Sequence, residues 1–117
     1  MYMKRITRQE KTFEVLNGYL KEDNTLNIGY VADLVSITAK NTRHLSEDRF
    51  NTRRKIRNIA ISELMYFIDR ELYFAGYENY YSTSRQVMQW DAKHGYGLES
   101  VLDLVVEDII EDRKERG

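Results

Sequence analysis

The sequence predicts an all-α protein, a compact single domain of about five helices. The chain has 117 residues, which is the length of one ordinary domain. It contains no proline, the residue that most strongly interrupts helices. Apolar residues recur at three- and four-residue spacing along most of the chain, and this is the period of a helix that packs on one side. We therefore expect residues 1–117 to form one helical bundle.

A first helix is predicted from Thr7 to about residue 22. Thr7 and Glu10 form a capping box, in which each side chain satisfies a backbone N–H at the helix start. Leu16 and Leu20 then follow at helical spacing. The segment 23–25, Asp-Asn-Thr, is expected to form a turn, because Asp and Asn side chains bind their own backbone.

Two short helices are predicted next, over about 28–35 and 38–45. The sequence Ser36-Ile37-Thr38 interrupts the apolar pattern between them, and Thr38 is a suitable N-cap for the second helix. A long helix is predicted from about Phe50 to Phe74, and it is apolar over most of its girth, as the central helix of a small domain would be. Gly76 is expected to end it.

The stretch 73–81 is rich in tyrosine, and a short β-hairpin is possible there because aromatic residues favour strands. A further helix is predicted from Thr83 to about Lys93, opened by a second capping box with Gln86 and ended by glycines 95 and 97. The last helix is predicted over 98–115, with an unusually wide apolar sector. Either two helices of the same chain or a second copy must cover that sector.

Composition excludes several classes of chemistry. The absence of cysteine excludes disulfides, thiolate catalysis and Cys-ligated metals. No stretch approaches the roughly 20 apolar residues that a membrane span requires, and no signal peptide is visible, so we expect a cytoplasmic protein. Asp91 and His94 lie one helical turn apart and could act as an acid–base pair, but a helix-capping role explains them better.

We therefore expect no catalytic residue, no cofactor and no metal. The four-residue spacing of Asp103, Glu107 and Glu111 would suit a metal-dependent hydrolase, and a solvated helix face accounts for it better.

Charge is distributed unevenly along this nearly neutral chain. Between Thr38 and Arg57, seven residues are basic and two are acidic, whereas between Leu98 and Gly117 seven are acidic and three are basic. Attraction to phosphate acts within about 10 Å at ordinary salt, so a local basic segment is sufficient for a nucleic-acid contact. The alternative is that both segments are the solvated faces of ordinary helices.

The segment 28–45 resembles the helix-turn-helix unit of DNA-binding proteins. Ala32 fits the small residue of the first helix, Ser36 stands at the turn position where Gly is common, and Ile37, Thr38 and Leu45 fit the following apolar and capping positions. Thr42 stands where Val or Ile is usual. The order of elements also resembles, more loosely, the N-terminal part of phage small-terminase subunits and small phage regulators. The resemblance implies that residues 28–57 bind duplex DNA.

In such a unit the outward residues of the second helix read bases in the major groove, and the basic residues that follow contact phosphates. The predicted DNA-binding residues are Lys40, Asn41, Arg43, His44, Arg49, Arg53 and Arg54. We expect a non-enzymatic DNA-binding protein, a regulator or packaging or recombination accessory factor of a phage or mobile element, acting as a homodimer or higher oligomer.

The main alternative is a phage-encoded inhibitor that contacts a host or defence enzyme through a tyrosine-rich surface, since exposed Tyr and Trp are favoured interface anchors. The predicted protein-interface residues are Tyr77, Tyr80, Tyr81, Trp90, Val101, Val105 and Ile109.

Overall fold

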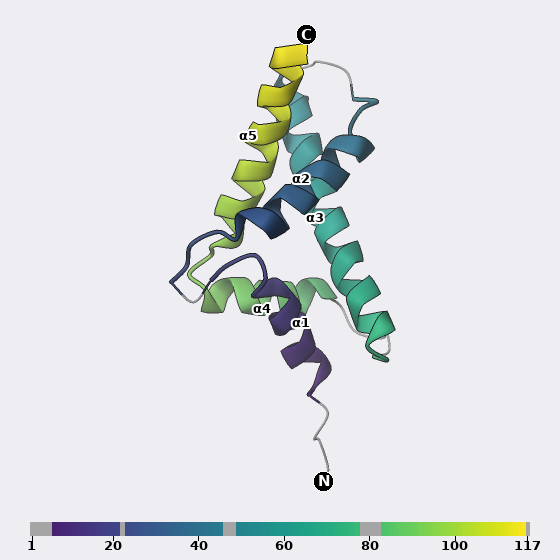
Figure 1. The fold of residues 1–117 in the computed structure, drawn as a ribbon, viewed down its shortest axis with the longest axis vertical. Helices are drawn as coiled ribbons and strands as arrows, with labels where there is room; N and C mark the ends of the chain where they lie inside the picture. Colours follow the sequence, from purple (N-terminus) through teal and green to yellow (C-terminus); the bar gives the residue numbers. More distant parts are fainter. Residues whose placement is uncertain (1–5, 22, 46–48, 78–82, 117) are drawn as a thin grey trace.

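The computed structural model describes residues 6–21, 23–45, 49–77 and 83–116, and of residues 49, 50 and 116 it describes the backbone only. These parts of the chain form five helices and contain no strand, which confirms the predicted all-α class (Figure 1). The helices are α1 (Arg8–Leu16), α2 (Ile28–Asn41), α3 (Arg49–Phe74), α4 (Thr83–Lys93) and α5 (Leu98–Arg116).

The long helix α3 organises the bundle, because it contacts all four of the other helices. Its first half packs with α2 and α5, and its second half packs with α1 and α4 (Figure 1). The molecule is accordingly elongated, with extents of 58 × 30 × 21 Å. Its two ends are therefore built from different helices, and the end formed by α2, α3 and α5 carries most of the predicted DNA-binding residues.

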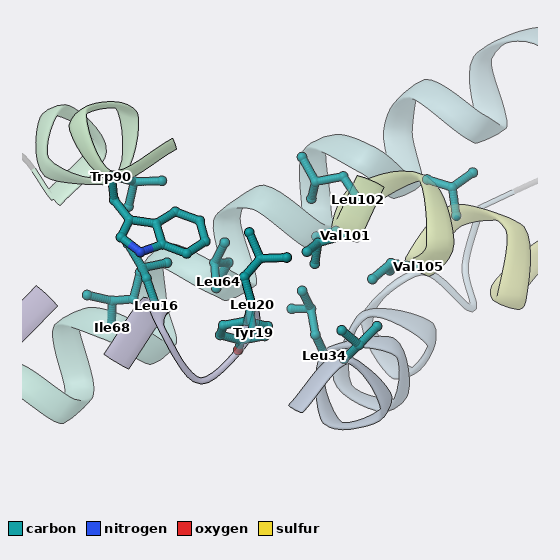
Figure 2. Close-up of a cluster of buried hydrophobic side chains, with 14 of the residues drawn as sticks. Leu16, Tyr19, Leu20, Leu34, Leu64, Ile68, Trp90, Val101, Leu102 and Val105 are labelled. Carbon is teal, nitrogen blue, oxygen red and sulfur yellow. The ribbon is translucent and has the colours of Figure 1, made fainter. Parts of the chain in front are cut away.

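One continuous core runs through both halves (Figure 2). On α3 it is built from a row of fully buried residues at four-residue spacing: Ile56, Ala60, Leu64, Ile68 and Leu72. Side chains four apart are neighbours on a helix surface, and at 100° per residue the row turns by about 160° from Ile56 to Leu72. This 26-residue helix can therefore face different helices in its two halves. Trp90 of α4 and Val101 of α5 pack against it, and both are fully buried.

The start of α1 is as predicted, but its end is not. Thr7 is the N-cap, and its Oγ1 accepts a hydrogen bond from the Glu10 backbone N–H at 3.1 Å. The helix ends at Leu16, about six residues earlier than expected, because the chain turns at Gly18 under the ring of Tyr30. A β-carbon at Gly18 would lie 2.8 Å from that ring, so glycine permits the approach. The predicted turn is confirmed by Asp23, whose carboxylate accepts from Thr25.

The prediction of two short helices with a break at Ser36-Ile37-Thr38 is wrong. Helix α2 runs without interruption from Ile28 to Asn41. Thr38 does not cap a second helix but lies inside α2 and is fully buried, whereas Ile37 is 45% exposed. The break was inferred from polar residues assumed to face water, and in this helix a polar residue faces the core while its apolar neighbour does not.

No hairpin forms over the described residues of 73–81. Helix α3 continues to Phe74 and closes at Gly76, whose φ is 86°, with the Tyr77 N–H donating to the Leu72 carbonyl at 2.9 Å. That bond and the left-handed glycine are the usual way in which a helix ends. Gly76 therefore ends the helix as predicted, while residues 78–82 lie outside the described part of the chain.

Candidate nucleic-acid interface

The predicted DNA-binding residues lie at the end of α2, just beyond it, and in the first turns of α3. Lys40, Asn41, Arg43 and His44 are exposed at and just beyond the last turn of α2. The end of α5 is fixed to this region, because the Arg113 guanidinium donates to the Thr42 carbonyl at 2.6 Å. The C-terminal ends of α2 and α5 and the N-terminal end of α3 thus form one end of the molecule.

The exposed face of α3 is basic and carries no carboxylate among its described side chains. Its exposed residues are Asn51, Arg53, Arg54, Lys55, Asn58, Ser62, Tyr66, Arg70, Tyr73 and Phe74. The carboxylates of α3 are half-buried instead. Glu63 accepts from the Asn41 side-chain amide at 2.8 Å, and Asp69 pairs with Arg8. This segregation is the electrostatic feature that a polyanion would meet along α3.

Two arginines of α3 form ion pairs with α5. Arg53 forms an ion pair with Glu107, and Arg57 donates to Glu99 at 2.6 Å and to Asp103 at 3.4 Å. The hydrogen bond from Arg53 holds the pKa of the Glu107 carboxyl below its ordinary value, and the same bond raises the pKa of Arg53. Arg53 was predicted to contact phosphate, and the structure instead assigns it to the contact between α3 and α5.

Four other cations at this end are available. The side chains of Lys40, Arg43, Arg54 and Lys55 are exposed and have no ion-pair or hydrogen-bond partner among the described residues. We call this set the basic end. Three of its members were predicted from the sequence, and Lys55 was not singled out. Arg49 starts α3 beside them, but its side chain lies outside the described part of the structure.

Helix α5 carries the opposite charge. Its exposed residues include seven carboxylates and, within the described side chains, one cation, Lys114. Glu99, Asp103 and Glu107 occupy the row that faces α3 at four-residue spacing, and they bind the α3 arginines. Spacing alone did not reveal this role, because the partner helix can only be identified from the tertiary arrangement.

The predicted protein-interface residues are mostly inside the molecule. Trp90, Val101, Val105 and Ile109 are buried in the core, and α2 and α3 together cover the apolar sector of α5. The alternative that two helices of the same chain cover α5 is therefore confirmed, and an interface formed by Val101, Val105 and Ile109 is excluded in this fold.

Of the three tyrosines in the same prediction, the structure describes Tyr77 alone. Tyr77 is half-buried, and its hydroxyl donates to the Ile6 carbonyl at 2.5 Å. Tyr80 and Tyr81 lie outside the described residues. The exposed aromatic side chains of this part of the chain are instead those of Tyr66, Tyr73 and Phe74 on α3.

The candidate acid–base pair is engaged structurally. One Asp91 carboxylate oxygen accepts from the Leu98 N–H at 2.8 Å, so this side chain caps the start of α5. The His94 ring stacks on Trp90 with 4.5 Å between ring centroids, and its Nδ1 lies 3.0 Å from the Trp90 carbonyl oxygen. Asp91 thus joins α4 to α5, whereas His94 contacts the last turn of α4, and both arrangements agree with the capping interpretation.

A buried polar cluster between α1, α3 and α4 could not be recognised in the sequence. The Arg8 side chain is only 10% exposed, and it donates to Gln86 at 2.6 Å and to Thr83 at 3.1 Å. Thr83 donates to Asp69, and Thr12 donates to Gln86. Thr83 and Gln86, predicted to form a capping box, are thus used to join three helices.

The described residues contain no helix long and apolar enough to cross a membrane. Within the same residues, no three His, Asp or Glu side chains are placed to share a metal ion. Comparison of the chain with protein-family models, with curated proteins and with solved structures finds no match.

Proposed function

We propose that this protein binds double-stranded DNA through the basic end. The observation that carries the proposal is the exposure of four cations that have no partner among the described residues: Lys40 and Arg43 at and just beyond the end of α2, and Arg54 and Lys55 in the first turns of α3. Lys and Arg bind phosphate oxygens through charge-assisted hydrogen bonds, and such contacts supply most of the affinity of proteins for DNA.

The mode of contact differs from the one that the sequence suggested. Because α2 is one continuous helix, the basic end consists of the last turn of one helix and the first turns of the next, without a separate reading helix. Asn41 is held by Glu63, so base reading by this side chain would first require that bond to break. We therefore propose binding dominated by phosphate contacts, with weak discrimination between sequences. Such binding suits a regulator or a packaging or recombination accessory factor of a phage or mobile element, a role that rests on the sequence resemblance.

A direct test is fluorescence anisotropy of a labelled random-sequence duplex at low salt. The wild-type protein should bind, and the Lys40→Ala/Arg43→Ala variant should bind roughly tenfold or more weakly, because two phosphate contacts are lost. The matched control is Arg85→Ala, which removes an exposed cation from α4 and should leave binding unchanged. Failure of the wild-type protein to bind would refute the proposal.

Two of the anchors predicted for the inhibitor alternative are not available, because Trp90 is buried and the Tyr77 hydroxyl donates to the Ile6 carbonyl. The exposed aromatic side chains of α3 are the observation that still bears on a protein partner.

A further inference from the structure

The second half of α3 exposes large apolar side chains on its outer side. Tyr66, Tyr73 and Phe74 are 65%, 68% and 72% exposed, and the rings of Tyr73 and Phe74 contact each other edge to face at 5.8 Å between centroids. Isolated exposed apolar residues are ordinary, but a cluster of aromatic rings on one side of one helix is typical of an interaction site.

The fold leaves this side of α3 open. The buried row that includes Ile68 and Leu72 faces the core formed with α1 and α4, which lie to the left of this half of α3 in Figure 1. No described helix lies to its right in the same view. Nearer the start of α3 the same side is only half-buried, at Ile59 and Glu63, and Asn41 of α2 donates to the Glu63 carboxylate there.

Five residues of α3 share one narrow sector: Ile59, Glu63, Tyr66, Arg70 and Phe74. At 100° per residue they fall within about 80° of the helix circumference. Tyr66, Arg70 and Phe74 are exposed, and Ile59 and Glu63 are half-buried. The Arg70 side chain has no partner among the described residues. The sector therefore combines apolar area with the Arg70 guanidinium, which has no partner among the described residues, and with the Glu63 carboxylate, one oxygen of which accepts from Asn41.

We propose that this sector binds the same sector of a second copy of the chain, with the two α3 helices antiparallel. When the two-fold axis passes between Tyr66 and Phe67, Glu63 of each copy lies opposite Arg70 of the other, and Ile59 lies opposite Phe74. Each pair occurs twice because a two-fold interface is self-complementary. The arrangement buries the exposed rings of Tyr66 and Phe74 and pairs Arg70 with a carboxylate.

A second copy fits this sector better than an unrelated protein does, because the sector is complementary to itself. When two copies are antiparallel, each charged residue faces a residue of opposite charge, and each apolar residue faces an apolar one. The overlap covers residues 59–74 and leaves the first half of α3, with the basic end, uncovered. At 1.5 Å per residue, Arg54 of the two copies would lie about 37 Å apart along the helix axes. That separation is close to one turn of duplex DNA, and this consequence rests on the proposed function.

The oligomeric state, measured without DNA by sedimentation equilibrium, tests the proposal. Wild type should be a dimer. Arg70→Glu and Glu63→Arg should each raise the dimer dissociation constant about tenfold or more, because each places like charges opposite one another twice. The double variant Glu63→Arg/Arg70→Glu should restore the dimer, since the reversed charges pair again. The control Arg85→Glu, on α4, should remain as dimeric as wild type.

A single-cysteine variant gives a second readout, because the chain has no native cysteine. Tyr66→Cys places a thiol beside the proposed two-fold axis, and mild oxidation should yield a disulfide-linked dimer. Met88→Cys, on the exposed side of α4, should not cross-link. A monomeric wild type, a dimer indifferent to Arg70→Glu, or equal cross-linking of the two cysteine variants would each overturn the proposal. None of these outcomes affects the DNA test, because each is measured on protein alone.

Discussion

Replacement of Thr38 by Val should stabilise the protein. The Thr38 side chain is fully buried, and its hydroxyl has no hydrogen-bond partner in the part of the chain that the structure describes. A buried polar group without a partner costs about 1–3 kcal/mol, because it has lost its hydrogen bonds to water. Valine has nearly the same shape and a similar helix propensity, so it removes this cost and leaves packing intact.

We expect a gain of about 1 kcal/mol in the free energy of unfolding, which corresponds to a rise of about 3–6 °C in Tm for a domain of this size. Thermal and urea denaturation followed by circular dichroism would measure both quantities. The matched control is Thr12→Val. Thr12 is equally buried, but its hydroxyl donates to the Arg8 carbonyl and to Gln86, so the same substitution should destabilise there by about 1–2 kcal/mol.

The sign of the Thr38 effect distinguishes the structure from the two-helix interpretation of the sequence. If Thr38 were the N-cap of a separate helix, its replacement would cost about 0.5–2 kcal/mol. A loss of stability in Thr38→Val, comparable to that in Thr12→Val, would therefore contradict the continuous α2 helix.

Two further predictions concern the core and the contact between α3 and α5. Leu64→Ala should lower the free energy of unfolding by about 2–5 kcal/mol, because Leu64 lies at the centre of the buried row of α3. Urea denaturation would measure the loss, and a loss below about 1 kcal/mol would contradict the buried position of Leu64. The pKa of the Glu107 carboxyl lies below its ordinary value of 4.5, so the stabilisation from its pair with Arg53 is present above that pH and is lost as pH falls through the lowered value. The Tm of wild type should therefore fall more steeply below pH 5 than that of Glu107→Gln. If Tm depended on pH in the same way in both proteins, the ion pair between Arg53 and Glu107 would be excluded.

The sequence predicted the elements whose signals are local. The start of α1 at Thr7 follows from a side chain and a backbone N–H three residues apart, and the end of α3 at Gly76 follows from the backbone freedom of one residue. The wide apolar sector of α5 was also recognised, and the sequence correctly indicated that more than one surface must cover it. The structure then showed that α2 and α3 do so.

The errors arose where tertiary contacts decide. A polar residue was assumed to be exposed, but Thr38 lies on the side of α2 that is buried, while Ile37 lies on the other side. Arg53 was assigned to phosphate because it lies in a basic segment, and it is paired with a helix that begins more than forty residues later in the chain. The partner of a charged side chain depends on how helices pack, which local patterns do not encode.

The salt dependence of duplex binding tests the central claim most directly. If Lys40, Arg43, Arg54 and Lys55 each neutralise one phosphate, the logarithm of the binding constant should fall with the logarithm of salt concentration with a slope of about −3.6. Arg54→Ala should reduce the magnitude of that slope by about 0.9, and Arg53→Ala, whose side chain is paired with Glu107, should leave it nearly unchanged. Binding that is independent of salt, or an equal change of slope in both variants, would contradict the assignment of the basic end to DNA.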